Sequence, residues 1–202
     1  MKHSIIIFFL AFLTACGGRY GRGLPKNIHE SEMWAKAIAD SPTECPEMSL
    51  LEPIVGRFDY RMEYTPYPGA KPVSSQGACA FRSDYRGRWL IGELKPTFAE
   101  GATVNTILLG YSDARARYLM GVIGAHPASV GGEGVRDLKN TSLVAINFEM
   151  SMPSPADSSE RTLFRRRIEI IDANTIVVTD YRSGWNGVLE PFQVVRMSRT
   201  ID

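Results

Sequence analysis

The sequence predicts an all-β fold: a closed, antiparallel, up-and-down barrel of about ten strands, preceded by one or two short helices. Two observations lead to this prediction. From residue 54 onwards, apolar and polar side chains alternate with a period of two, and hairpin-length turns separate the alternating segments with almost no helical pattern between them. Because such a meander must hide its edges, it closes or stacks, and sequential hairpins favour an up-and-down barrel over a Greek-key sandwich.

Composition and charge fit a single globular domain with appendages. The 202 residues are 44% hydrophobic and 22% charged, which is ordinary for a globular protein and indicates neither disorder nor a fibrous repeat. The formal net charge is +1, so the chain has no basic excess that would indicate a nucleic-acid partner.

The first residues match an export signal. A positive start at Lys2 precedes the uncharged run 5–13 (IIIFFLAFL). As a helix this run would rise about 14 Å, roughly half of a bilayer core, so it is too short to span a membrane. It fits the apolar part of a secretory signal peptide that covers residues 1–15.

Residues 13–17 (LTACG) resemble the lipobox of bacterial lipoproteins, in which small residues lead into a cysteine. The resemblance implies that Cys16 becomes the acylated N-terminus of the mature protein, since several acyl chains anchor a protein firmly to a membrane. Gly17, in place of an aspartate, favours the outer membrane facing the periplasm. The alternative is a plain secreted protein whose discarded leader includes Cys16.

Two further segments are expected before the strands begin. Residues 16–27 are rich in Gly and Arg and should form a flexible tether. Residues 28–40 place apolar side chains at helical spacing, which predicts a short amphipathic helix that ends before Pro42. A second helical turn is expected over 47–53. Residues 28–53 therefore form the helical part, and residues 54–202 the barrel.

Each strand is predicted from its own alternation. In the first, Phe58, Tyr60 and Met62 alternate with charged residues, which gives one apolar and one wet face. The other expected strands are 73–81, 88–94, 104–111, 115–123, 130–138, 143–150, 162–171, 175–181 and 191–197.

A run of three arginines, Arg165 to Arg167, lies within one of these strands. Neighbouring strand residues point to opposite faces, so Arg165 and Arg167 share one face and Arg166 takes the other. The run is interpreted as part of a solvated exterior. The alternative is that an inward arginine holds a carboxylate-bearing ligand.

Two cysteines, Cys45 and Cys79, remain beyond the leader. An exported protein meets an oxidising compartment, where this pair could form a disulfide worth roughly 3–4 kcal/mol. Two buried free thiols are the alternative. Neither cysteine has a histidine or a second cysteine at metal-ligand spacing, so no metal site is predicted.

Residues 46–58 (PEMSLLEPIVGRF) resemble the opening of an uncharacterised bacterial family with a lipocalin-like (calycin-type) fold, whose members begin P-E-M-x-x-L-x-x-L-x-G-x-W. Residues 87–90 (GRWL) and 109–112 (LGYS) resemble its later strands. The resemblance spans about residues 46–199 and implies a barrel with a cavity, but no known ligand. In lipocalins and nitrobindins the aromatic of G-x-W closes one end of the barrel, and a basic residue of the last strand packs on it. Here these would be Phe58 and Arg199 (or Arg196).

No catalytic residue or cofactor is predicted. Residues 110–114 (GYSDA) contain a G-x-S-x-A pattern, but the serine opens a hairpin, whereas a nucleophile elbow needs a following helix. Beyond the leader the histidines are His29 and His126, and none follows His126, so neither haem nor a metal is expected.

Three functions remain open. The leading hypothesis is a membrane-anchored lipoprotein whose barrel cavity binds a small apolar or amphipathic molecule. The alternative is a structural or protein-interaction lipoprotein of the envelope with a solid barrel core. A third is an isomerase or cyclase with Glu93 or His126 as an inward acid or base. Aromatic and sulphur-bearing strand residues are the candidate ligand contacts, with ordinary core packing as their alternative: Tyr60, Met62, Trp89, Tyr118 and Met120.

Overall fold

The structure is a computed structural model, which describes residues 45–84, 87–96, 104–124, 130–153, 160–184 and 187–200. The chain divides into two compact units, residues 1–42 and 43–202, and all described residues belong to the second. The predictions for the signal peptide, Cys16, the tether, the helix over 28–40 and both His29 and His126 lie outside the described residues.

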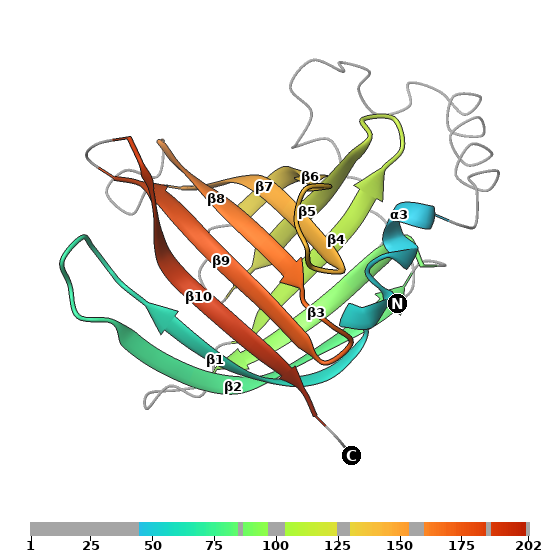
Figure 1. The fold of residues 1–202 in the computed structure, drawn as a ribbon, viewed down its shortest axis with the longest axis horizontal. Coiled ribbons are helices and arrows are strands. Elements are labelled where there is room, and N and C mark those ends of the chain that lie inside the picture. Colours follow the sequence, from blue (N-terminus) through green and yellow to red (C-terminus); the bar gives the residue numbers. More distant parts are fainter. Residues whose placement is uncertain are drawn as a thin grey trace, which may run out of the picture. The chain divides into compact units, whose positions relative to one another are not determined.

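Two helical turns precede ten antiparallel strands in the described part of the chain (Figure 1). The turns are α3 (Pro46–Ser49) and the 3-10 helix η1 (Glu52–Ile54). The strands are β1 (Gly56–Tyr64), β2 (Val73–Asp84), β3 (Trp89–Pro96), β4 (Asn105–Ser112), β5 (Arg117–Ile123), β6 (Val130–Arg136), β7 (Val144–Pro153), β8 (Arg161–Ile170), β9 (Thr175–Ser183) and β10 (Leu189–Arg199).

The strands form a closed up-and-down barrel. Each strand pairs with its neighbours in sequence, and β1 also pairs with β10, which closes the ring. The predicted fold class is therefore confirmed. The helical turn expected over 47–53 is divided in two: α3 ends at Ser49, whose carbonyl would need a backbone N–H that Pro53 lacks, and η1 begins at Glu52.

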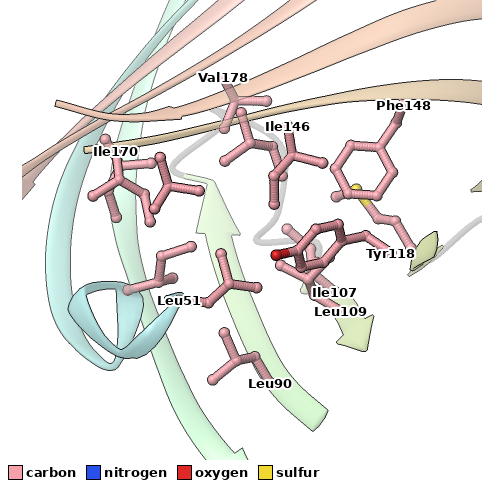
Figure 2. Packing of buried hydrophobic residues seen from close by; sticks show 14 of the residues in the cluster. Leu51, Leu90, Ile107, Leu109, Tyr118, Ile146, Phe148, Ile170 and Val178 are labelled. Atoms are coloured by element: carbon pink, nitrogen blue, oxygen red, sulfur yellow. The ribbon is translucent and has the colours of Figure 1, made fainter. Parts of the chain in front are cut away.

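The barrel has two different ends. At the helix end, β1 begins, and there the connections between strands are 84–89, 112–117, 136–144 and 170–175. At the opposite end, which we call the loop end, the connections are 64–73, 96–105, 123–130, 153–161 and 183–189. The helical turns cover the helix end, where Leu51 is fully buried. Figure 2 shows Leu51 among the inward apolar side chains, with Leu90 and Ile170 on either side in that view.

Arg199 joins the last strand to the helical turns. Its guanidinium lies 4.7 Å from the centre of the buried Phe58 ring. Its Nη1 and Nη2 donate to the backbone oxygens of Val55 and Pro53, and its Nε donates to the oxygen of Ala173 at 2.9 Å. The predicted contact between Phe58 and Arg199 is thus present. We call this arrangement the Arg199 latch.

Cys45 and Cys79 are both free and buried, so the possible disulfide is not formed. Cys79 lies inside the barrel on β2, where its Sγ is 3.7 Å from the Met197 sulphur. Cys45 precedes α3 at the helix end, where its Sγ is 3.9 Å from a carboxylate oxygen of Glu47. The alternative of two buried thiols describes the structure.

Candidate functional site

The two halves of the barrel interior differ in burial. Toward the helix end the inward apolar side chains have almost no exposure, as Leu51, Ile146 and Ile170 at 0% show. Toward the loop end the inner wall contains apolar side chains that stay partly exposed: Met62, Leu94, Val122, Val130, Met152 and Phe192. Partly exposed apolar groups on an inner wall mean that solvent reaches the loop-end half of the interior.

Four of the five predicted ligand contacts face the interior. Tyr60 and Met120 are buried in the core, and Met62 is partly buried against it. Tyr118 also points inward, but it belongs to the closed helix end: its hydroxyl donates to the backbone oxygen of Glu47 at 3.2 Å. The structure therefore separates Tyr118 from the accessible half, and the ligand-binding role of the other three stays a prediction.

Two predictions on β3 were wrong because alternation assigns these residues to the outer face. Leu90 takes the inner position, so Trp89 lies outside, where its ring covers Gly110 of β4. Glu93 also lies outside, with Arg82 and Lys95 at 3.8 and 3.9 Å. The isomerase hypothesis therefore loses Glu93 as an inward acid or base.

An ion pair between Arg166 of β8 and Asp180 of β9 lies inside the barrel. Arg166 Nε and Nη2 donate to Asp180 Oδ1 and Oδ2, both at 2.7 Å. The two side chains are 12% and 3% exposed. Both face inward because Ile168 and Val178, two positions away, belong to the buried core. Arg166 is therefore the inward arginine of the run, and its binding of a carboxylate-bearing ligand stays a prediction.

Gln193 of β10 completes the surroundings of Asp180. Its Nε2 donates to Asp180 Oδ2 at 3.1 Å, so both carboxylate oxygens accept hydrogen bonds. Arg166 has weaker hydrogen bonds on its other side, because its Nη1 lies 4.0 Å from the sulphur of Met120, which is a weak acceptor. In this cluster the Asp180 carboxylate accepts hydrogen bonds at both oxygens, whereas the Arg166 guanidinium has N–H groups without a strong acceptor.

A second guanidinium, Arg182, lies two residues further toward the loop end of β9. Its Nη1 donates to the backbone oxygens of Thr65 at 3.2 Å and Pro66 at 3.3 Å. Its Nε is buried without a hydrogen-bond partner, as is the hydroxyl of Ser75 on β2. Buried polar atoms without partners are costly, so these two mark places where a ligand or water would be stabilising.

Aromatic rings lie between the two guanidinium groups. A register shift between Pro191 and Gln193 turns Phe192 inward, where its ring meets the Phe164 ring edge-on at 6.0 Å. Arg166 lies 5.7 Å from the centre of Phe164, and Arg182 lies 5.8 Å from the centre of Phe192. The loop-end half thus combines apolar walls with two nearby cationic groups.

Sequence reasoning missed Asp180, Arg182 and Gln193. The first two could have been found, because the buried residues Ile176 and Val178 show which face of β9 points inward. The next two positions on that face are the charged residues Asp180 and Arg182. No comparable signal exists for Gln193, since it follows the register shift in β10.

Burial should make the protein less stable in alkali. It raises the pKa of the Cys79 thiol from 9 to about 12 and that of the Tyr118 hydroxyl from 10 to about 12. The folded state therefore keeps protons that the unfolded chain releases, so stability is complete below pH 9 and falls as pH rises from 9 to 12. Urea unfolding between pH 8 and 11 should show this fall, and it should be shallower in Cys79→Ala and Tyr118→Phe. Equal slopes in all three proteins would contradict the assignment.

We describe two hollows that are lined by described residues. The larger, about 1230 Å³, lies against the outer wall over β6 to β9, where Glu133, Leu163 and Arg165 point outward. The smaller, about 430 Å³, lies at the helix end between Glu47 of α3 and Tyr118 of β5. Arg166 is among the residues that line the larger hollow, whereas Asp180 lines neither of the two.

One group of potential metal ligands occurs among the described residues. Ligand atoms of Cys45, Glu47 and Asp113 lie within 4.8 Å of one another. Asp113, however, already pairs with the Arg88 guanidinium at 3.1 Å, which a cation would have to displace. We therefore assign no metal to this group.

Comparison with known proteins places this barrel in a family. A family model described as "Protein of unknown function (DUF1579)" matches residues 43–199. The chain belongs to this family. The match begins just before α3 and ends with the last residue of β10, so the DUF1579 domain includes the helical turns, the whole barrel and the Arg199 latch.

A solved structure supports the fold of this DUF1579 domain. The crystal structure of Rv2717c from M. tuberculosis is 14% identical, with a TM-score of 0.57 over 78% of this chain and 99% of that one. At this identity the likeness shows the barrel fold alone. A redesigned beta barrel is 12% identical over 79% of this chain and all of its own, but its TM-score of 0.32 supports no argument. No curated protein matches the chain.

Among the described residues, no helix has the length and apolar character needed to cross a bilayer.

Proposed function

We propose that this DUF1579 protein is a membrane-tethered, lipocalin-like binding protein, which holds a small amphipathic molecule in the loop-end half of its barrel. The observation that carries the proposal is the partly exposed apolar inner wall around a buried charged pair. An apolar wall with a few convergent polar groups is the usual character of a small-molecule site.

In this proposal the helix end of the barrel is the rigid, closed part and the loop end is the binding part. The helix end is closed by Leu51 and held by the Arg199 latch, which supports a rigid wall. The loop end would admit the ligand. There the apolar part of the ligand would contact Met62, Met120 and Met152, whose flexible thioether side chains adapt to varied shapes.

The location of the protein is part of the same proposal. The lipobox-like residues 13–17 would give the mature chain an acylated Cys16, and the tether would keep the barrel near the membrane surface. A binding protein at that place would meet amphipathic molecules at high local concentration, which fits an apolar interior.

Extraction of bound lipid tests the proposal. Protein purified without detergent should release a molecule of defined mass into organic solvent, in an amount close to one per barrel. A matched variant with a narrowed inner wall, Val122→Phe, should carry several times less, whereas the outward substitution Val135→Phe should carry the wild-type amount. Equal amounts in both variants would contradict binding inside the barrel.

A second candidate is an interaction protein with a solid core. It is favoured by the position of the larger hollow, about 1230 Å³, on the outside of the wall. Leu163 in this hollow is 76% exposed, which suits a protein contact. Purified protein that is consistently free of extractable molecules, together with a photo-cross-link from position 163 to one envelope protein, would favour this candidate.

A further inference from the structure

We infer that the ligand has an anionic head group, and that the guanidinium of Arg166 binds it inside the barrel. This inference rests on the proposed function and adds the chemical class of the ligand. Its basis is the set of hydrogen-bond donors in the interior that have no strong acceptor.

Arg166 has donors to spare. A guanidinium has five N–H groups, and the bidentate contact with Asp180 uses one on Nε and one on Nη2. The remaining edge, formed by Nη1 and the second N–H of Nη2, has the sulphur of Met120 at 4.0 Å from Nη1. Two parallel N–H groups on one edge match the two oxygens of a carboxylate or a similar oxyanion.

The carboxylate oxygens of the cluster are already engaged. Both oxygens of Asp180 accept from Arg166, and Oδ2 also accepts from Gln193. Gln193 donates one N–H of Nε2 to that bond and keeps its amide oxygen as an acceptor. With the free edge of Arg166, the remaining donors of the cluster outnumber its remaining acceptors, and a donor-rich site selects ligands with acceptors.

The charges point the same way. The Arg166–Asp180 pair is neutral, and Arg182 adds a positive charge nearer the loop end. Glu190 lies opposite Arg182 in the sheet register, but its carboxylate approaches Gly184. The buried Nε of Arg182 has no hydrogen-bond partner. It is therefore a second free donor on the way of an anion that enters from the loop end.

Asp180 and Gln193 act as positioning residues in this arrangement. They hold the guanidinium by its Nε edge, so the free edge keeps a fixed direction in the apolar interior. A charge-assisted hydrogen bond in such surroundings is stronger than one in water, because the local dielectric constant is lower. A neutral amphiphile of the same length would gain the apolar contacts and lose this bond.

Calorimetric titration of the purified full-length protein with decanoate and decanol at pH 7.5 tests the inference. Decanoate should bind at least about tenfold more tightly than decanol, the effect of one charge-assisted bond. The double variant Arg166→Met/Asp180→Leu removes the pair without leaving a lone charge. It should bind decanol within about threefold of wild type and lose the preference for decanoate.

Arg165→Met supplies the matched control, because Arg165 is the neighbouring arginine on the exposed outer face. It should keep the full preference for decanoate. Equal binding of the two ligands by wild type, or a preference that survives in the double variant, would overturn the inference while leaving the proposed function in place. Binding of neither ligand would overturn both.

Discussion

Replacing Asp180 by alanine is expected to lower the free energy of unfolding by about 3–5 kcal/mol. The substitution leaves the guanidinium of Arg166 inside the barrel, where its side chain is 12% exposed, without the carboxylate that accepts its two short hydrogen bonds. A buried charge without its partner costs far more than the intact pair contributes. Urea unfolding followed by far-UV circular dichroism measures the change.

The double variant Arg166→Met/Asp180→Leu separates this explanation from simple loss of packing. Because it replaces both charged groups by apolar ones of similar volume, its stability should equal that of wild type or exceed it by about 1–4 kcal/mol. A double variant as unstable as Asp180→Ala would mean that the pair itself stabilises the barrel. In that case the pair would be part of the structural core, and its free donors would not mark a binding site.

Replacing Phe58 by alanine is expected to cost about 3–5 kcal/mol of unfolding free energy. The Phe58 ring is 0% exposed, lies under the guanidinium of Arg199 and contacts the Phe81 ring edge-on at 6.3 Å. Its removal leaves a cavity beneath the helical turns. Chemical unfolding of the variant measures the loss.

Arg199→Met should cost about 2–3 kcal/mol, because the carbonyls of Pro53, Val55 and Ala173 lose a charged donor. Its matched control is Arg196→Met, at an exposed position three residues earlier in β10, which should change stability by less than about 0.5 kcal/mol. Similar losses at positions 196 and 199 would show that the latch contributes no more than an ordinary surface arginine.

The barrel was predictable because its signal is local. Alternation in each strand depends on residues two positions apart, and the up-and-down order follows from the short connections. The contact between Phe58 and Arg199 was predictable for a different reason, the resemblance of residues 46–58 to the opening of barrel proteins in which such a pair closes one end.

The candidate site was harder to predict because it depends on register between strands. The arginine run showed that Arg166 faces away from its neighbours, and the apolar residues Ile168 and Ile170 share its face. The partner of Arg166 was not predictable, because its pairing with Asp180 depends on the register between β8 and β9. Phe192 reaches the interior through a register shift, which alternation cannot anticipate. Trp89 was predicted as a ligand contact because of its residue type. Its neighbour Leu90 is buried inside the barrel, however, so Trp89 lies on the outer face.

Methyl NMR of protein labelled at its methionines tests the central claim most directly, because described methionines lie at both ends of the interior. Addition of decanoate should shift the methyl signals of Met62, Met120 and Met152 in the loop-end half. The signal of Met48 in α3 should stay in place, since Met48 is buried at the helix end. Shifts confined to Met48, or no shift at all at saturating decanoate, would contradict the account.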